Sequence, residues 1–182
     1  MDNFLRKRLK EMRYGVRALK PQVLKEVAGD VAEKAYIRSD ARLLDLVAIS
    51  YSLAKLMEKS FIADSPEWKK FYPVVMQSLD ICFEQVEEGK EDECYSLFGE
   101  LIRKIEAFST SRNRFLRNVV EKSRIKAATQ VYAHGASLRL AASLSGVDMS
   151  ELASYIGATR IPDKYFTLTV KERLKIADEL FS

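Results

Sequence analysis

The stretch from Leu43 to Met57 constrains the fold of this chain more than any other segment. Its apolar side chains do not gather on one side of a helix; they occur at nearly every angle around it: Leu43, Leu44, Leu46, Val47, Ile49, Leu53, Leu56 and Met57. A helix that is apolar nearly all round is normally surrounded by other helices. We therefore predict that this segment, which begins after the capping residues Ser39 and Asp40, lies at the centre of the core.

The rest of the chain supplies the helices that such a centre needs. Apolar residues recur three and four apart along most of the 182 residues, which is typical of amphipathic helices. With 7 Gly and 4 Pro, the chain has little turn material for an all-β fold. The pattern predicts helices over 2–18, from Pro21 onwards and, after the capping box of Thr169 and Glu172, over 170–181.

Pro73 is expected to interrupt the helix that follows the central segment. Proline has no backbone N–H, and its ring clashes with the preceding helical turn. We therefore predict a short turn at 66–72, a helix at 73–88 and an acidic loop from Glu87 to Glu93.

A regular apolar pattern then runs from about residue 92 to residue 134. One helix of this length would extend about 60 Å. The short hydroxyl side chains of Ser109, Thr110 and Ser111 compete for backbone hydrogen bonds and mark a possible break, so the pattern leaves one helix or two open. We predict an all-α fold in which a helical bundle body, residues 1–110, is joined by a long helix to a small C-terminal module within 111–182.

The segment from Ser137 to Gly157 has the spacing of a helix-turn-helix. Ala142, Gly146, Leu152 and Tyr155 fall at offsets 0, 4, 10 and 13. A small residue lets two helices cross closely, glycine allows the turn, and the two later apolar residues face inward. With the helix before it, this segment predicts a helix-turn-helix-like module over about 123–157.

The second helix of this module is poorly suited to read DNA. It offers no Arg, Lys, Asn or Gln to base edges, and Asp148 and Glu151 would face phosphates. This favours a protein-docking role. Positive charge gathers instead in residues 1–20 and 112–126. This distribution leaves three alternatives open: a nucleic-acid surface, charge pairing within or between chains, or solvated helix faces. The candidate binding residues are Arg112, Arg114, Arg117, Arg124, Lys126, Arg139, Glu151 and Arg160.

Few residues are available for catalysis or metal binding. Cys82, Cys94 and His134 are too few for a zinc site of Cys and His, and no phosphate-binding glycine loop or nucleophile motif is present. We expect the cysteines to be buried and the histidine to end a helix, with no cofactor, metal or enzyme activity. Leu43 to Met57 is too short and too polar to span a bilayer, and residues 1–20 lack the apolar core of a signal peptide, so we expect a cytoplasmic protein.

The run from Ala127 to Ile161 resembles a segment shared by a family of uncharacterised archaeal helical proteins. That family's signature is Y-x-H-G-x-S-L, then A-A-x-L-x-G-V, then E-L-x-x-Y-x-G-x-T-[RK]-I. The run is also similar to small antitoxin-like proteins that accompany PIN-domain ribonucleases. The matching positions are Tyr132, His134, Gly135, Ser137, Leu138, Ala141, Ala142, Leu144, Gly146, Glu151, Leu152, Tyr155, Gly157, Thr159, Arg160 and Ile161.

The resemblance implies a regulatory or binding protein and no known reaction. Where such proteins have S-L-G-R-A-A, this chain has the run from Ser137 to Ala142, so its basic residue, Arg139, stands one position earlier. We predict a non-enzymatic docking protein, a homodimer, whose partner is a protein such as a PIN-domain ribonuclease. The alternative is a DNA- or RNA-binding protein that uses residues 1–20 and 112–126.

Overall fold

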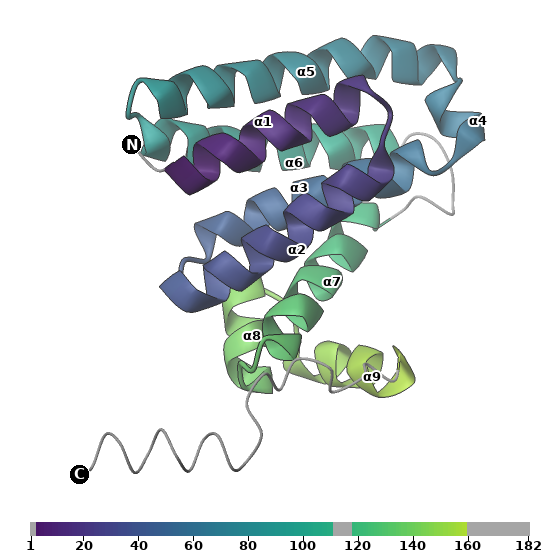
Figure 1. The fold of residues 1–182 in the computed structure, drawn as a ribbon. Helices are drawn as coiled ribbons and strands as arrows, with labels where there is room; N and C mark the ends of the chain where they lie inside the picture. Colours follow the sequence, from purple (N-terminus) through teal and green to yellow (C-terminus); the bar gives the residue numbers. More distant parts are fainter. Residues whose placement is uncertain (1–2, 111–117, 160–182) are drawn as a thin grey trace.

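The computed structural model describes residues 3–110 and 118–159, and all regular structure within them is helical (Figure 1). The predicted all-α class is confirmed. In chain order the helices are α1 (Asn3–Arg17), α2 (Pro21–Arg38), α3 (Arg42–Met57), α4 (Ser60–Ala63), α5 (Pro66–Glu87), α6 (Glu91–Thr110), α7 (Val119–Ala133), α8 (Leu138–Ser145) and α9 (Met149–Thr159).

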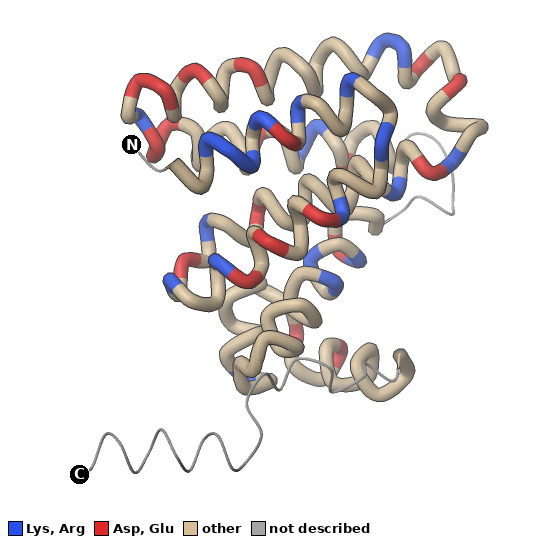
Figure 2. Tube along the Cα trace, viewed as in Figure 1, with Lys and Arg blue, Asp and Glu red and all other residues tan. Residues whose placement is uncertain are grey.

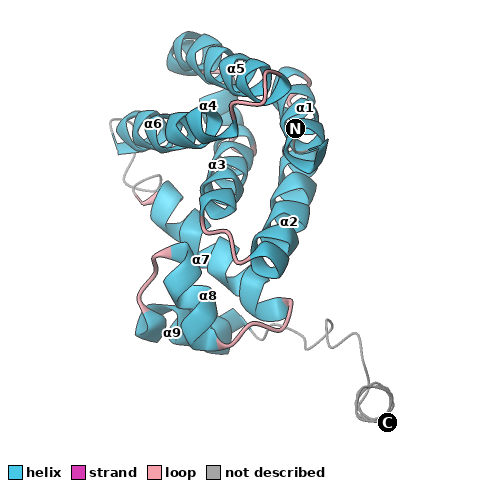
Figure 3. Cartoon of the chain, turned by 90° about the vertical axis from the view of Figure 1, so that its left-hand side faces the viewer, coloured by secondary structure: helices cyan, strands magenta, loops and turns pink. Residues whose placement is uncertain are grey.

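Helix α3 lies at the centre of the core, as its apolar surface predicts. It packs against α2, α6 and α7, and it passes between α2 and α6 in Figure 3. Of its 16 residues, all except Arg42, Asp45 and Lys55 are buried. Because complete burial of one Leu or Ile side chain contributes about 1.5–3 kcal/mol, this helix supplies a large share of the hydrophobic stabilisation.

Helices α1, α2, α5 and α6 pack in series, and α2 and α6 also pack on α3. Helix α1 packs on both α2 and α5, and α5 packs on α6. The approach of α1 to α2 is close because Gly15 has no side chain: a Cβ there would lie 3.1 Å from Leu24 Cδ2. Leu9 and Met12, fully buried, fill the space that α1 shares with its neighbours.

Helix α5 runs without interruption through Pro73, so the predicted break there is wrong. The hydroxyl of Ser65 caps the helix by accepting a hydrogen bond from the Trp68 N–H at 3.1 Å. Pro73 and Lys69 both lie on the exposed side of α5. Because proline has no N–H, the Lys69 carbonyl receives no hydrogen bond from residue 73. Water can satisfy that carbonyl, while burial of residues such as Leu79 on the opposite side holds the helix together.

The predicted acidic loop is also shorter than expected. Helix α5 ends at Glu87 and α6 begins at Glu91, which leaves only residues 88–90 between them. Gly89 has φ 77°, a value that glycine adopts without strain. The acids Glu91, Asp92 and Glu93 form the first turn of α6, where the helix dipole favours negative charge.

The described residues between 92 and 134 form two helices, α6 and α7. Asn118 has φ 64°, which a continuing α-helix cannot accommodate, and α7 starts after it. Helix α7 does not protrude as a connector, because it packs along α3 and α2. The hydroxyl of Ser52 on α3 donates to that of Ser123 on α7 at 3.0 Å. Of the two alternatives that the sequence left open, the described residues show two helices, whereas the domain boundary at residue 110 stays a prediction.

Helices α8 and α9 lie at the end of the molecule opposite α5 (Figure 1), where they pack chiefly on α7 and on each other. The predicted C-terminal helix over 170–181 falls outside the described residues. Thus the described part of the chain has a densely packed bundle, α1–α7, with a small two-helix addition at one end.

Candidate functional site

The turn between α8 and α9 forms from the local signals that the sequence displays. The Ser137 hydroxyl caps α8 by accepting a hydrogen bond from the Leu140 N–H at 3.1 Å. Gly146 ends α8 with φ 63°. The Asp148 carboxylate then accepts hydrogen bonds from the N–H groups of Ser150 and Glu151, at 2.9 and 3.0 Å, and so caps α9. The helix bounds match the predicted spacing closely, except that α9 continues past Gly157 to Thr159.

The residues expected to face inward do so. Leu152 is fully buried, Ala142 is buried, and Tyr155 is partly buried against the core. Together they fix α8 and α9 to α7. Helices α7, α8 and α9 thus pack on one another through these residues, whereas their assignment as a helix-turn-helix-like module stays a prediction.

The outer surface of α9 has almost no charge. Of the 11 residues in α9, Leu152 is the only buried one and Glu151 is the only charged one. At about 100° per residue, six exposed residues cover about half of the helix circumference. We call these residues the α9 face: Met149, Ser150, Ala153, Ser154, Gly157 and Ala158.

An exposed helix in a globular protein usually carries charged and polar side chains on its outer side. The α9 face instead has small side chains and the half-exposed apolar side chain of Met149. Figure 2 shows the contrast, since α8 and α9 are almost entirely tan while α1 carries several blue stretches. A neutral surface of small residues can be approached closely by another helix, so it is suited to protein contact.

The basic residues of α1 are held mainly by acids of the same chain. Arg6 pairs with Glu87 at 2.7 Å, and Asp80 accepts from Arg13 at 2.6 Å and from Arg17 at 3.4 Å. All these acids are on α5. This arrangement is the intramolecular pairing that the sequence left open, and sequence reasoning did not identify the α5 acids as its partners.

Of the predicted binding residues, Arg124 is engaged inside the bundle. Its guanidinium lies 3.1 Å from an Asp45 carboxylate oxygen, which joins α7 to α3. Partial burial raises the pKa of Asp45, and the Arg124 cation opposes that shift. Arg124 therefore stabilises a carboxylate that would otherwise be costly to ionise at this depth.

The other candidate residues do not form one cluster in the described structure. Lys126 on α7 is half-buried, Arg139 on α8 is exposed, and Glu151 lies at the edge of the α9 face. No hydrogen bond or ion pair joins these three within residues 3–110 and 118–159. The remaining candidates fall outside the described residues: Arg112, Arg114, Arg117 and Arg160.

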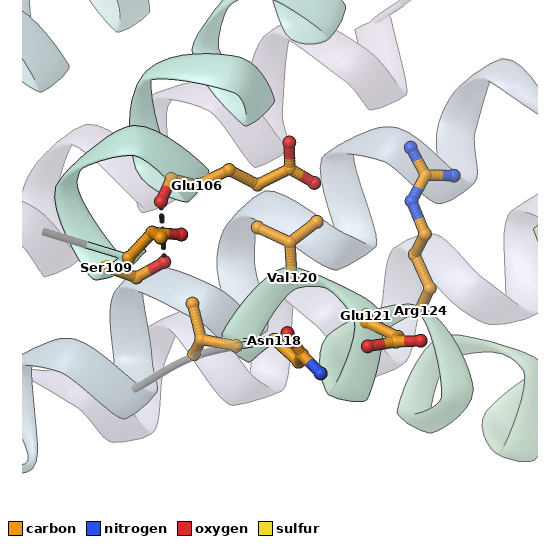
Figure 4. A pocket seen from close by; sticks show the side chains of 8 residues that line it. Glu106, Ser109, Asn118, Val120, Glu121 and Arg124 are labelled. Carbon is orange, nitrogen blue, oxygen red and sulfur yellow. Dashed lines mark hydrogen bonds between the residues drawn. The ribbon is translucent and has the colours of Figure 1, made fainter. Parts of the chain in front are cut away.

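A cavity of about 390 Å³ lies where the end of α6 meets the start of α7 (Figure 4). Its lining combines the carboxylates of Glu106 and Glu121 with the guanidinium of Arg124 and the side chain of Val120. Since Arg124 already pairs with Asp45, the cavity offers mixed charge with no single ligand chemistry.

The cysteines and the histidine occupy the positions expected of structural residues. Cys82 and Cys94 are fully buried, and the Cys82 thiol lies 3.8 Å from the carbonyl oxygen of Cys94. The neighbouring Cys82 thiol and burial both raise the pKa of Cys94, which disfavours the reactive thiolate. His134 is the C-terminal cap residue of α7.

Among the described residues, no group of three or more His, Cys, Asp and Glu side chains is arranged to hold a metal ion. None of the described helices combines the length and the apolar character that crossing a bilayer requires.

No protein-family model, curated protein or solved structure matches this chain. The similarity to archaeal and antitoxin-like proteins therefore stays a prediction from the motif alone. The geometry of the described helices is the remaining support for a function, and its most unusual feature is the α9 face.

Proposed function

We propose that this protein is a non-enzymatic docking protein that binds a protein partner through the α9 face. The observation that carries the proposal is the combination of exposure and missing charge on α9: one buried residue and one charged residue among 11. A helix held by so few contacts gains stability when its neutral outer side is covered by a second apolar surface.

The chemistry of this end of the molecule favours a protein over nucleic acid. From Leu138 to Thr159 the chain has one basic residue, Arg139, against Asp148 and Glu151. Phosphate binding needs clustered cations, and the first turn of α9 presents acids where a DNA-reading helix presents donors. The motif resemblance names the PIN-domain ribonucleases as a partner class, so the protein would act as their antitoxin-like regulator.

The experiment compares two variants of the full chain that gain the same charge at different places. Ala153→Arg puts a cation in the middle of the α9 face, whereas Gln77→Arg puts one on the exposed side of α5. Proteins that co-purify with the tagged chain from its native cells are identified, and each is then titrated in purified form against both variants.

We expect one protein to bind the native chain and Gln77→Arg equally and to lose at least tenfold in affinity for Ala153→Arg, because a buried cation in an apolar contact is costly. Equal binding to all three chains would place the interface elsewhere.

Two other outcomes would replace the proposal. A chain that retains nucleic acid instead, with affinity that falls steeply between about 50 and about 200 mM salt, is the alternative nucleic-acid-binding protein. A native chain that forms the expected homodimer, which Ala153→Arg dissociates with no other partner found, uses the α9 face for self-association. Sedimentation of all three chains separates these cases.

A further inference from the structure

We propose that two copies of this chain associate through the outer sides of α1 and α2, so that the basic side of each copy faces the acidic side of the other. The sequence predicts a homodimer without indicating its surface, and these two helices supply one. The inference goes beyond the proposed function, because it does not involve the α9 face.

Helices α1 and α2 form one outer layer of the bundle. They pack on each other in opposite directions and are joined by the turn at residues 18–20. Both lie in front of α3 in Figure 1, and both lie on the same side of α3 in Figure 3. Their outward sides therefore form one continuous surface of the described structure.

The two outward sides of this layer carry opposite charges. Exposed residues recur three and four apart on each helix, so they lie on one side of it. On α1 they include three cations and no acid, and we call them the basic face: Asn3, Lys7, Lys10, Tyr14 and Arg17. On α2 they include three acids and no cation, and we call them the acidic face: Gln22, Glu26, Asp30, Glu33 and Ile37. Figure 2 shows blue stretches along α1 and red stretches along α2.

Much of the charge on these faces is not neutralised within the chain. The side chains of Lys10 and Glu33 form no hydrogen bond or ion pair within residues 3–110 and 118–159. Asp30 accepts from Arg8 at 2.7 Å, yet half of the Asp30 side chain stays exposed. Lys7 lies 4.0 Å from Glu11, which is the limit of an ion pair. The faces therefore keep charges that a partner can pair.

Other cations of α2 point away from the acidic face. Lys25 forms an ion pair with Glu58 at the end of α3. Lys34 lies over the ring of Phe4 on α1, 5.7 Å from its centroid. The acidic face thus stays acidic although α2 also contains basic residues.

The two faces have matching register. Lys10 and Lys7 stand 9 and 12 residues before Leu19 in the turn, whereas Asp30 and Glu33 stand 11 and 14 residues after it. A difference of two residues along a helix is about 3 Å, so the acids lie nearly level with the cations. A two-fold axis parallel to the helices then brings Lys10 of each copy opposite Asp30 of the other. The same axis brings Lys7 opposite Glu33, so the surface is self-complementary, as a symmetric dimer requires.

The same arrangement disfavours nucleic acid as the occupant of the basic face. Packed helices lie about 8–10 Å apart, and the Debye length is about 10 Å at 0.1 M salt. Phosphates placed along α1 would therefore be repelled by the acids of α2. A second copy instead pairs both faces at once, which is the complementarity that selects a partner and its orientation.

The size of the layer predicts a weak dimer. Two helices of about 22 Å length and about 10 Å width present roughly 450 Å² per copy, or about 900 Å² in total, below the approximately 1,200 Å² of stable interfaces. The half-exposed side chains of Tyr14 and Ile37 add apolar contact to the ion pairs. Exposed ion pairs contribute little each and are screened by salt, so the association should be reversible and salt-sensitive.

Charge reversal in the full chain tests the contact. The acidified chain has Lys7→Glu with Lys10→Glu, and the basified chain has Asp30→Lys with Glu33→Lys. Each is measured alone, and the two are measured as an equimolar mixture, by sedimentation at several protein concentrations. In the mixture, opposite charges face each other on both helices, so a recovery of association also shows that both variants are folded.

The control chain has Lys69→Glu with Lys70→Glu, which changes the net charge as much as in the acidified chain, at exposed positions of α5. It should dimerise as the native chain does.

We expect the native chain to dimerise, with a dissociation constant that rises at least tenfold between low salt and about 1 M salt, where the Debye length is only about 3 Å. The acidified and the basified chain alone should each bind themselves at least tenfold more weakly, since like charges then face each other. Their mixture should associate about as strongly as the native chain.

A second measurement uses the native chain alone. Unlabelled and ¹⁵N-labelled copies are mixed and treated with a carbodiimide, which joins a lysine amine to a nearby carboxylate with loss of water. We expect linked peptides that combine one labelled and one unlabelled part, between Lys10 and Asp30 and between Lys7 and Glu33. Links that occur only within one label lie inside one molecule and contradict the proposal.

Several results would overturn the proposal. A native chain that stays monomeric at low salt has no such interface, and a mixture that associates no better than its separate components shows that the two faces do not meet. Dimerisation equal in all these chains lies on another surface, and a dimer that Ala153→Arg dissociates uses the α9 face. Since Ala153→Arg leaves α1 and α2 unchanged, failure of the docking function and failure of this dimer are distinguishable.

Discussion

Helices α1 and α9 are both peripheral, yet they expose opposite kinds of surface. Helix α1 has the following charged residues: Arg6, Lys7, Arg8, Lys10, Glu11, Arg13 and Arg17. It nevertheless buries five residues along one side, and four of its cations pair with acids on α2 or α5. Helix α9 has one charged residue and buries one side chain.

The comparison teaches that charge in a sequence does not indicate which surface is available for binding. The most basic helix of the described chain is largely neutralised by its own fold. Helix α9, with one charged residue among 11, leaves half of its circumference open. An argument from charge alone points to α1, whereas burial and pairing together point to α9.

The largest expected effect separates the two helices by how they are anchored. Leu9→Ala should lower the free energy of unfolding of the whole chain by about 2–5 kcal/mol, because it leaves a cavity among α1, α2 and α5. Leu152→Ala removes the one buried side chain of α9 and should instead loosen that helix locally. Denaturant titration measures the first effect, and amide hydrogen exchange measures the second. If Leu152→Ala destabilises the whole molecule as much as Leu9→Ala does, the two helices are anchored equally and the contrast between them is wrong.

A smaller effect tests the pairing of α1 with α5. Asp80→Asn combined with Glu87→Gln removes the acids that hold Arg6, Arg13 and Arg17. Because these pairs are partly exposed, stability should fall by only about 1 kcal/mol. The released cations should add a salt-dependent affinity for double-stranded DNA, measured by fluorescence anisotropy.

The matched control is Glu84→Gln with Glu93→Gln, which changes the net charge equally at exposed positions not joined to α1 by a hydrogen bond or ion pair in the described structure. Equal gains in DNA affinity for both double variants would show that net charge, and not released pairing, is responsible.

The smallest effect compares two glycines. Gly15→Ala in α1 should lower stability by about 0.5–1 kcal/mol, because its Cβ would meet the buried Leu24 at 3.1 Å. Gly157→Ala in α9 should raise it by about 0.5–1 kcal/mol, since the added methyl enters open space and alanine favours the helix. Thermal unfolding of both variants measures whether each change raises or lowers stability. A loss of stability at both positions would mean that α9 is as closely covered as α1.

Several features of the fold were accessible from the sequence because they act over a few residues. The turn at Gly146 was recognised from its spacing within the segment that starts at Ser137. The central position of α3 followed from its apolar circumference. The predicted break at Pro73 was wrong because helix continuity there does not depend on neighbouring residues alone. The local cost of proline, about 3 kcal/mol, is outweighed by the burial of residues on the other side of α5.

The candidate site was only partly predictable. The inward positions Ala142 and Leu152 were identified by spacing, and so was the scarcity of DNA-reading side chains on α9. The extent of the open α9 face was not identified, although the single charge between Met149 and Thr159 was a usable signal. The binding role of Arg124 was expected from charge, and its pairing with Asp45, 79 positions away, could not be read from any local pattern.

By itself, the sequence determined that this chain is helical, which segment forms the centre, and where the α8–α9 turn begins and ends. Helical periodicity and capping are properties of neighbouring residues, so they need no knowledge of the rest of the molecule. The tertiary structure alone decided which charges are neutralised and which surface stays open. Arg6 and Glu87 stand 81 positions apart, and Arg13 and Asp80 stand 67 apart. Only the packing of α1 on α5 brings those pairs together, and no other described helix packs over the outer side of α9.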